Sequence, residues 1–140
     1  MNAFIDTNVL MDCLDDRREN FEKAHCLLQA IKDKQIKAVI STQAIVDSAY
    51  LYTGPMKRSV PVFRLFVDKL FSFISVCEVT QSDIGFANKS SIPDYEDAVQ
   101  VSCALRSGCD TILSGDRDFQ KYTDIPVYSV PELFSKLFEE

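Results

Sequence analysis

Short apolar runs alternate with longer amphipathic segments along the whole chain. The short runs predict strands at residues 3–6, 38–41, 74–79 and 110–114, and an edge strand at 126–130. The longer segments repeat apolar residues at helical spacing and predict helices at residues 8–14, 19–34, 42–52, 62–73, 81–90, 94–107 and 131–138. Residues 115–125 are expected to form a loop. This alternation predicts an α/β fold in which helices flank a parallel sheet of four to five strands.

The size of the chain predicts one domain. It has 140 residues, of which 46% are hydrophobic, enough for one compact core. We therefore expect residues 1–140 to form a single domain. The first apolar run is broken by Asp6 and lacks a basic leader, and no apolar run is long enough to span a membrane. These features predict a cytoplasmic protein without membrane association.

The cysteines and the single histidine argue against zinc and triad chemistry. His25 has no Cys or His at ligand spacing except Cys26, which the helical pattern directs elsewhere. The cysteines form no CxxC pair and lie mostly in apolar contexts, which predicts buried, reduced thiols. They are Cys13, Cys26, Cys77, Cys103 and Cys109.

Four aspartates fall at the carboxyl ends of predicted strands or on the helices beside them: Asp6, Asp47, Asp97 and Asp116. In open parallel sheets ligands bind beyond these strand ends, so the four side chains can converge there. Convergence of like charges is unfavourable unless a divalent cation neutralises them. Oxygen ligands without His or Cys suit one or two Mg²⁺ or Mn²⁺ ions. Such ions activate water and stabilise the leaving oxygen in phosphodiester hydrolysis.

Each of these acids also has a structural interpretation. Asp6 is well placed to cap the helix that follows it. Asp94 and Asp97, three residues apart at a helix start, resemble a capping box. A solvated helix face or an ordinary turn equally suits the remaining acids, Asp47, Asp116 and Asp118.

The order of the motifs resembles the PIN-domain family, in particular the VapC-like bacterial PIN ribonucleases. The matching stretches are FIDTNVL at 4–10, STQAIVDSAY at 41–50, DYEDA at 94–98 and SGDRDF at 114–119. The resemblance runs over nearly the whole chain and implies a single PIN-like domain with metal-dependent endoribonuclease activity. It further implies the toxin component of a toxin–antitoxin pair, often a homodimer, inhibited by a cognate antitoxin protein that occludes the site.

The resemblance also implies roles for individual residues. Asp6 and Asp97 would ligate Mg²⁺ or Mn²⁺ directly, and Asp116 would complete the metal site through water. Together with Asp47 these acids form the expected catalytic set. The residues implied to surround the ligands and orient them or their waters are Thr7, Asn8, Asp94, Ser114 and Asp118.

One position departs from the family pattern. Asp47 stands in the helix after the second strand, where the family commonly has glutamate. Losing one methylene retracts the carboxylate by ~1.5 Å, and a misplacement of about 1 Å in a catalytic site can cost on the order of 100-fold in rate. An alternative therefore remains open: a non-catalytic PIN-like module that binds nucleic acid or protein and has a degenerate metal site.

The charge balance restricts how RNA is held. A formal net charge of −6 argues against a broad phosphate-binding surface, so contacts must be local or metal-assisted. Arg117, which flanks the acids, is the favoured substrate-binding residue, and a single-stranded or looped RNA is the expected substrate. The helix at 62–73 carries more apolar surface than one sheet face needs. Core burial accounts for this equally well, but an apolar patch left exposed would predict homodimerisation.

Overall fold

Every strand runs parallel to its neighbours in the computed structural model of the chain, which describes residues 1–139. The strand order is β3-β2-β1-β4-β5. Register pairs Ile5 of β1 with Ile40 of β2 and Leu113 of β4, so the carboxyl ends of these central strands lie level. The five parallel strands confirm the predicted sheet, and the last strand lies at its edge. Their bounds are β1 (Asn2–Ile5), β2 (Lys37–Ser41), β3 (Ser75–Cys77), β4 (Thr111–Leu113) and β5 (Val127–Tyr128).

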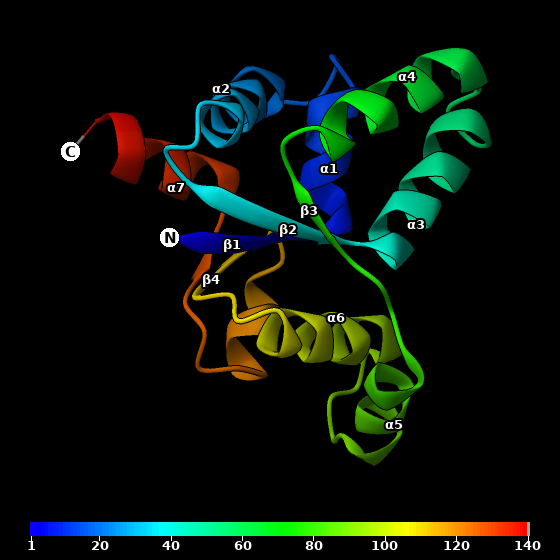
Figure 1. The fold of residues 1–140 in the computed structure, drawn as a ribbon, viewed down its shortest axis with the longest axis vertical. Coiled ribbons are helices and arrows are strands. Elements are labelled where there is room, and N and C mark those ends of the chain that lie inside the picture. The colour runs from blue at the N-terminus through cyan, green and yellow to red at the C-terminus, as the bar shows by residue number, and fades with distance from the viewer. Residues whose placement is uncertain (140) are drawn as a thin grey trace.

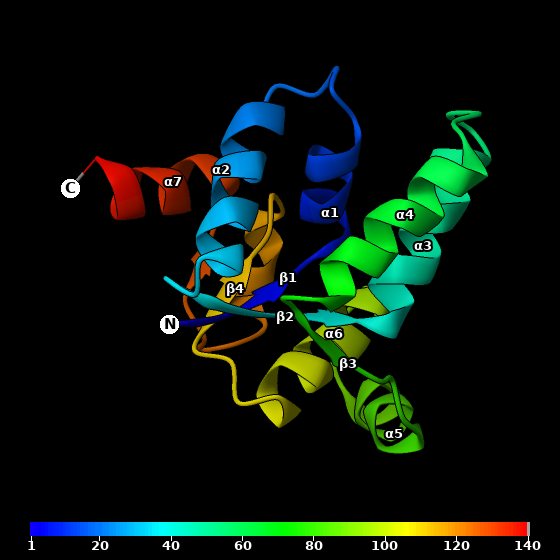
Figure 2. The same cartoon turned by 45° about the horizontal axis from the view of Figure 1, so that its top comes forward.

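Helices cover both faces of the sheet (Figure 1). Helices α1, α2 and α7 lie on one side of the sheet, and α5 and α6 lie on the other. Helices α3 and α4 lie side by side, next to α1 (Figure 2). The α-helices are α1 (Thr7–Leu14), α2 (Phe21–Lys32), α3 (Thr42–Thr53), α4 (Val60–Phe71), α5 (Gln81–Lys89), α6 (Tyr95–Arg106) and α7 (Val130–Phe138).

The alternation of side chains along the strands divides the core between the two faces. Ile5 and Ile40 pack with Leu10 and Leu27 from α1 and α2. Their neighbours in sequence face the other way, so Phe4 packs with α6. Period-two alternation on strands that are covered on both faces explains why each run is apolar throughout.

The pair of helices α3 and α4 has its own apolar contact. Tyr52 and Phe63 pack with ring centroids 5.9 Å apart, and Met11 of α1 joins them. The pair leaves several apolar side chains on the surface. Those exposed on α3 and α4 include Val46, Tyr50, Val62, Leu65 and Phe71.

A buried ion pair fixes α5 against α6. Asp83 is 0% exposed and accepts hydrogen bonds from Arg106 Nη2, Ser102 Oγ and Thr80 N, each at 2.8 Å. Burial acts to raise the pKa of Asp83, but Arg106, Thr80 and Ser102 together hold that pKa well below its usual range. Because α6 also carries Asp97, this contact helps to set the position of the candidate site.

Two expectations need correction. Residues 115–125 are not a plain loop, because a 3₁₀ helix, η1 (Arg117–Lys121), begins after Asp116, whose side chain caps it. Cys26 is exposed rather than buried, since its side chain lies on the outer face of α2, whereas the other four cysteines are buried and all five are free thiols. Within residues 1–139 no helix has the length and apolar character needed to cross a membrane.

Candidate functional site

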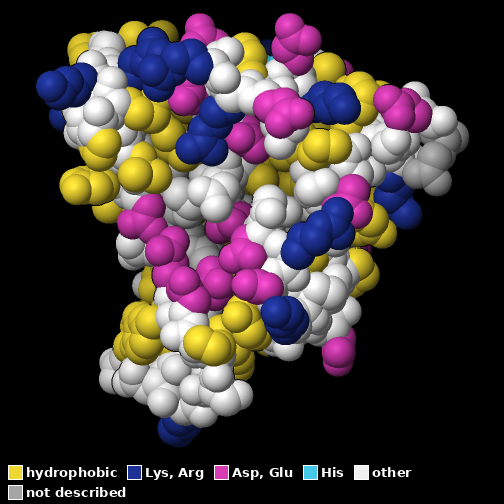
Figure 3. Space-filling model, turned by 180° about the vertical axis from the view of Figure 1, so that it is seen from behind, with side chains coloured by type: hydrophobic (Ala, Val, Ile, Leu, Met, Phe, Trp, Pro, Cys, Tyr) yellow, Lys and Arg dark blue, Asp and Glu magenta, His cyan; other side chains and the backbone are white. Residues whose placement is uncertain are grey.

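The predicted acids meet in a cleft of ≈ 360 Å³ at the carboxyl ends of the central strands. Figure 3 shows Asp and Glu side chains gathered around a hollow on this face. No Lys, Arg or His occurs in the cleft wall that the structure describes. The lining residues are Asp6, Thr7, Asn8, Asp47, Tyr50, Leu51, Asp94, Glu96, Asp97 and Asp116.

Asp6 lies at the floor of the cleft, where β1 ends and α1 begins. It is 7% exposed, and its backbone N–H continues the sheet by donating to Leu113 O. One carboxylate oxygen accepts from Thr7 N and the other from Ser114 Oγ, each at 2.8 Å. Burial raises the pKa of Asp6, and Asp116 adds to the increase, against the opposing hydrogen bonds. Asp6 therefore acts as a helix cap and also presents a buried carboxylate to the cleft.

Ser114 connects two of the acids. Its hydroxyl donates to Asp6 and accepts from the backbone N–H of Asp116 at 3.0 Å. Asp116 in turn accepts from Asp118 N at 2.9 Å, which caps η1. The loop after β4 is thus folded so that Asp116 faces the carboxylate of the neighbouring strand. Ser114 therefore contacts both Asp6 and the backbone of Asp116.

The start of α6 supplies two further acids. Asp94 caps the helix by accepting from Asp97 N at 3.0 Å, as its structural interpretation predicted. Burial raises the pKa of Asp97 to about 6, and the nearby carboxylates of Asp94, Asp116 and Asp6 contribute to the rise. A helix N-terminus normally stabilises negative charge. Burial and repulsion among the acids act against this stabilisation at Asp97.

Glu96 is the acid that sequence reasoning missed. It lines the cleft opposite Asp47, and the two carboxyl groups lie within hydrogen-bond reach of each other. Burial and the adjacent Asp47 raise the pKa of Glu96 to about 7. Asp47 itself accepts from Gln43 Nε2 at 2.8 Å on the same helix. Glu96 lies in the DYED run of the sequence, but it was given no role there, because only Asp94 and Asp97 were singled out in that run.

Three predicted site residues do not line the cleft: Ser114, which bonds to Asp6, and Arg117 and Asp118, whose side chains point elsewhere. Arg117 is directed to Glu132 of α7, with Nη2 3.2 Å from Oε1, and its side chain is 81% exposed. Asp118 pairs with Lys121 at 3.0 Å. Neither lines the cleft, because η1 turns both side chains to the outer surface. The structure therefore brings Asp6, Asp47, Asp97 and Asp116 together with Thr7, Asn8 and Asp94, and it leaves Arg117 and Asp118 apart.

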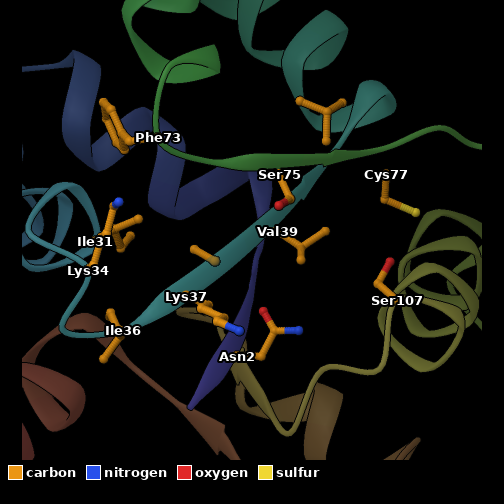
Figure 4. Close-up of a pocket in the computed structure, with 12 residues that line it drawn as sticks. Asn2, Ile31, Lys34, Ile36, Lys37, Val39, Phe73, Ser75, Cys77 and Ser107 are labelled. Atoms are coloured by element: carbon orange, nitrogen blue, oxygen red, sulfur yellow. The ribbon is translucent and has the colours of Figure 1, made fainter.

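A larger hollow of ≈ 530 Å³ lies elsewhere, beside the edge strand β3. Figure 4 shows Lys37, Val39 and Ser75 on its wall, with Cys77 and Ser107 at one end. None of the predicted acids reaches it, and its wall combines aliphatic and hydroxyl side chains with Lys34 and Lys37 but contains no carboxylate. The acidic cleft is therefore the better candidate site despite its smaller volume.

The cleft has the donor chemistry of a hard-metal site. All six carboxylates present oxygen, which Mg²⁺ and Mn²⁺ prefer, and three of them have raised pKa values that a cation would lower. Among residues 1–139 no three His, Cys, Asp or Glu side chains lie close enough to define a metal centre by geometry alone. Mg²⁺ commonly keeps several waters and uses one or two carboxylates, so a wide acidic cleft fits such an ion.

The raised pKa values predict that the metal-free protein loses stability as pH rises. A carboxyl whose pKa is higher in the folded state binds more protons when folded, so unfolding becomes easier as pH increases. For Glu96 and Asp97 the window runs from their ordinary values, 4.5 and 3.8, to about 7 and about 6. Because both side chains are partly solvated, we expect a fall of about 1 kcal/mol in unfolding free energy between pH 5 and 8.

This loss is measurable by thermal unfolding in EDTA at the two pH values. A Glu96→Gln, Asp97→Asn double variant should flatten the dependence, and millimolar Mn²⁺ should restore stability at pH 8 more than at pH 5. Stability that rises across this range in EDTA would show that the acids do not repel one another as the geometry indicates.

Comparison with known proteins identifies the family. The sequence model of the PIN domain matches residues 2–118, most of the chain, and the chain belongs to this family. One curated relative, Ribonuclease VapC1 of Aquifex aeolicus (strain VF5), is 24% identical over 138 residues, which cover 93% of this chain and 91% of the relative.

Solved structures share the fold at low sequence identity. VapC20 of Mycobacterium tuberculosis, described as a Sarcin-Ricin loop cleaving toxin, superposes with a TM-score of 0.69 at 13% identity and covers 89% of this chain and 98% of its own. VapBC2 of Rickettsia felis, bound to a DNA fragment from its promoter, gives 0.64 at 14% identity, with coverage of 92% and 98%. These likenesses confirm the α/β PIN fold.

Proposed function

We propose that this protein is a Mg²⁺- or Mn²⁺-dependent endoribonuclease that hydrolyses RNA phosphodiester bonds, and that it is the toxin of a toxin–antitoxin pair acting in the cytoplasm. The observation that carries the proposal is the cleft itself. In this PIN domain, six carboxylates converge at the carboxyl ends of the strands, and the described cleft wall contains no Lys, Arg or His. Similarity to a ribonuclease, VapC1, over nearly the whole chain supports the same activity.

The residues of the cleft have separable roles in this proposal. Asp6, Asp97 and Asp116 would hold the one or two ions. Ser114 fixes Asp6 through its hydroxyl. When bound, the metal would lower the pKa of a bound water and stabilise the leaving oxygen of the phosphodiester. Glu96 lies within hydrogen-bond reach of Asp47, and burial together with this neighbour raises the pKa of Glu96 to about 7.

The surroundings of the cleft favour an unpaired RNA. Because the described wall offers no Lys or Arg, the phosphate must be held mainly through the metal. Tyr50, 70% exposed at the rim, offers a ring on which an unstacked base can lie. A single-stranded or looped RNA can present such a base, whereas a regular duplex cannot.

A cleavage assay on a pool of structured and unstructured RNAs tests the activity. We expect cleavage that requires Mn²⁺ or Mg²⁺, stops in EDTA and favours unpaired positions. Asp68→Asn on α4 is a matched control, because this exposed acid lies outside the cleft. Metal binding without cleavage of any RNA would instead favour the alternative, a non-catalytic binding module, for which the short side chain of Asp47 is the supporting observation.

The exposed apolar side chains of α3 and α4 support a homodimer. Val62, Leu65 and Phe71 lie on the outer surface of α4, and Val46 and Tyr50 lie on α3. Apolar surface concentrated on one pair of helices commonly marks an interface. The proposed antitoxin is a second partner, and it would occlude the acidic cleft.

We expect sedimentation equilibrium to show a dimer at micromolar concentration and Leu65→Glu to shift it to monomer. Since Leu65 is already exposed, the folded subunit should change in stability by no more than about 0.5 kcal/mol. Asp68→Asn, on the same helix, should leave the dimer intact. A wild-type protein that sediments as a monomer throughout this range would contradict self-association.

A further inference from the structure

A buried amide on α6, the helix that carries Asp97, plays no part in the roles described so far. Gln100 of α6 is 1% exposed. It follows Asp97 by three residues, a spacing that places the two side chains on the same side of the helix. Its Oε1 accepts a hydrogen bond from Ser41 Oγ at 3.1 Å. Ser41, also fully buried, ends β2 and caps α3 by accepting from Ala44 N at 3.0 Å.

This contact connects the two walls of the cleft. Helix α6 carries Asp97 and Glu96, whereas α3 carries Asp47. One hydroxyl, Ser41 Oγ, both fixes the start of α3 and bonds to α6. Ile5 of β1 is paired with Ile40 of β2, and the two strands are parallel. The residues that follow this pair, Asp6 and Ser41, are therefore neighbours, and the Ser41–Gln100 hydrogen bond lies beside the carboxylate of Asp6.

The same region holds the unsatisfied polar atoms of the structure. Within residues 1–139, Thr7 Oγ1 and Gln100 Nε2 are the buried side-chain N or O atoms without a hydrogen-bond partner. Thr7 follows Asp6 directly, and Gln100 follows Asp97 by three residues. Unpaired buried polar atoms are unfavourable and call for an explanation. Both lie within three residues, along the chain, of a carboxylate that would hold the metal.

We propose that Gln100 is a positioning residue of the metal site, which sets the spacing between the carboxylates of α6 and α3 through its bridge to Ser41. The inference rests on the proposed metal-dependent function. It adds to the proposed site a residue that supports the metal ligands without touching metal or RNA. A purely structural glutamine would affect stability alone. A positioning residue affects metal affinity and the catalytic constant even where the fold is preserved.

Gln100→Met tests the bridge with a side chain of similar length. We expect Mn²⁺ affinity by calorimetry to fall about 10-fold, as for other residues that orient ligands. The cleavage rate should fall through kcat with KM for RNA unchanged. Melting temperature should change little, because an apolar side chain of similar shape removes a poorly satisfied amide. Gln29→Met, the same change on α2 away from the cleft, should leave all three quantities at wild-type values.

Ser41→Ala breaks the same bridge from the other side and carries the test if Gln100→Met does not fold. Ser41→Ala also removes the cap on Ala44 N, so the double variant should bind Mn²⁺ as weakly as Ser41→Ala alone, because the bridge is already absent there. A folded Gln100→Met or Ser41→Ala protein with wild-type Mn²⁺ affinity and kcat would overturn the positioning role alone. A wild-type protein that binds no Mn²⁺ would overturn the proposed function as well, so the two failures are distinguishable.

Discussion

Replacing Asp6 by Asn is expected to abolish RNA cleavage while leaving the protein at least as stable as the wild type. Asp6 is the floor carboxylate of the cleft, and its loss removes a central metal ligand. We expect cleavage to fall at least about 100-fold. The amide is isosteric, so its oxygen can still accept from Thr7 N, and its NH₂ group can donate to Ser114 Oγ.

Stability should not fall, because the wild-type charge is unfavourable where it lies. Burial and the nearby Asp116 raise the pKa of Asp6, so the neutral amide relieves repulsion in the metal-free protein. Thermal unfolding in EDTA measures this directly. Asp6→Asn with reduced stability and normal cleavage would show that Asp6 serves only as a cap, and Asp68→Asn is the control for loss of one negative charge.

Among single substitutions of partly exposed side chains, Arg106→Met is expected to give the largest loss of stability. The substitution leaves the fully buried Asp83 without its cation, although Thr80 and Ser102 still donate to it. It also removes the bond from Arg106 Nη2 to Glu78 O at 2.6 Å. We expect the unfolding free energy to fall by about 2–3 kcal/mol, which corresponds to a drop on the order of 10 °C in melting temperature.

The pH dependence identifies the cause of this loss. Arg106, the hydroxyl donors and the backbone amide hold the pKa of Asp83 low against the effect of burial. The stability that ionised Asp83 contributes is therefore present above the unfolded pKa of 3.8 and is lost as pH falls. The difference between wild type and Arg106→Met should therefore shrink in acid. Arg64→Met on α4, where the arginine is exposed and forms no ion pair within residues 1–139, should change stability by no more than about 0.5 kcal/mol. Equal effects at both arginines would contradict a specific clamp.

The order of strands and helices was predictable because it depends on local periodicity. The buried runs are uniformly apolar and the helices have regular apolar faces. The convergence of Asp6, Asp47, Asp97 and Asp116 was also predictable, because acids at the carboxyl ends of parallel strands meet at one edge of the sheet. The resemblance to PIN domains, carried by four short stretches, agreed with both arguments.

Contacts between distant residues could not be predicted in this way. The Ser41–Gln100 bridge spans 59 residues and the Arg106–Asp83 pair spans 23, and no local pattern indicates either partner. Glu96 was missed because the motif and the capping pattern singled out Asp94 and Asp97, and the partner of Glu96, Asp47, lies 49 residues away in the sequence. Arg117 was expected near the substrate from its place in the sequence, whereas the turn into η1 directs it to Glu132.

Calorimetric titration of Mn²⁺ into the wild type and Asp6→Asn tests the central claim most directly, because it measures the metal site without requiring the correct RNA. We predict saturable binding of one or two ions to the wild type, tighter at pH 8 than at pH 6 because protons compete for Glu96 and Asp97. Asp6→Asn should lose this binding. Wild-type protein that shows no Mn²⁺ binding, or equal binding by both proteins, would contradict a metal site at the carboxyl ends of the sheet.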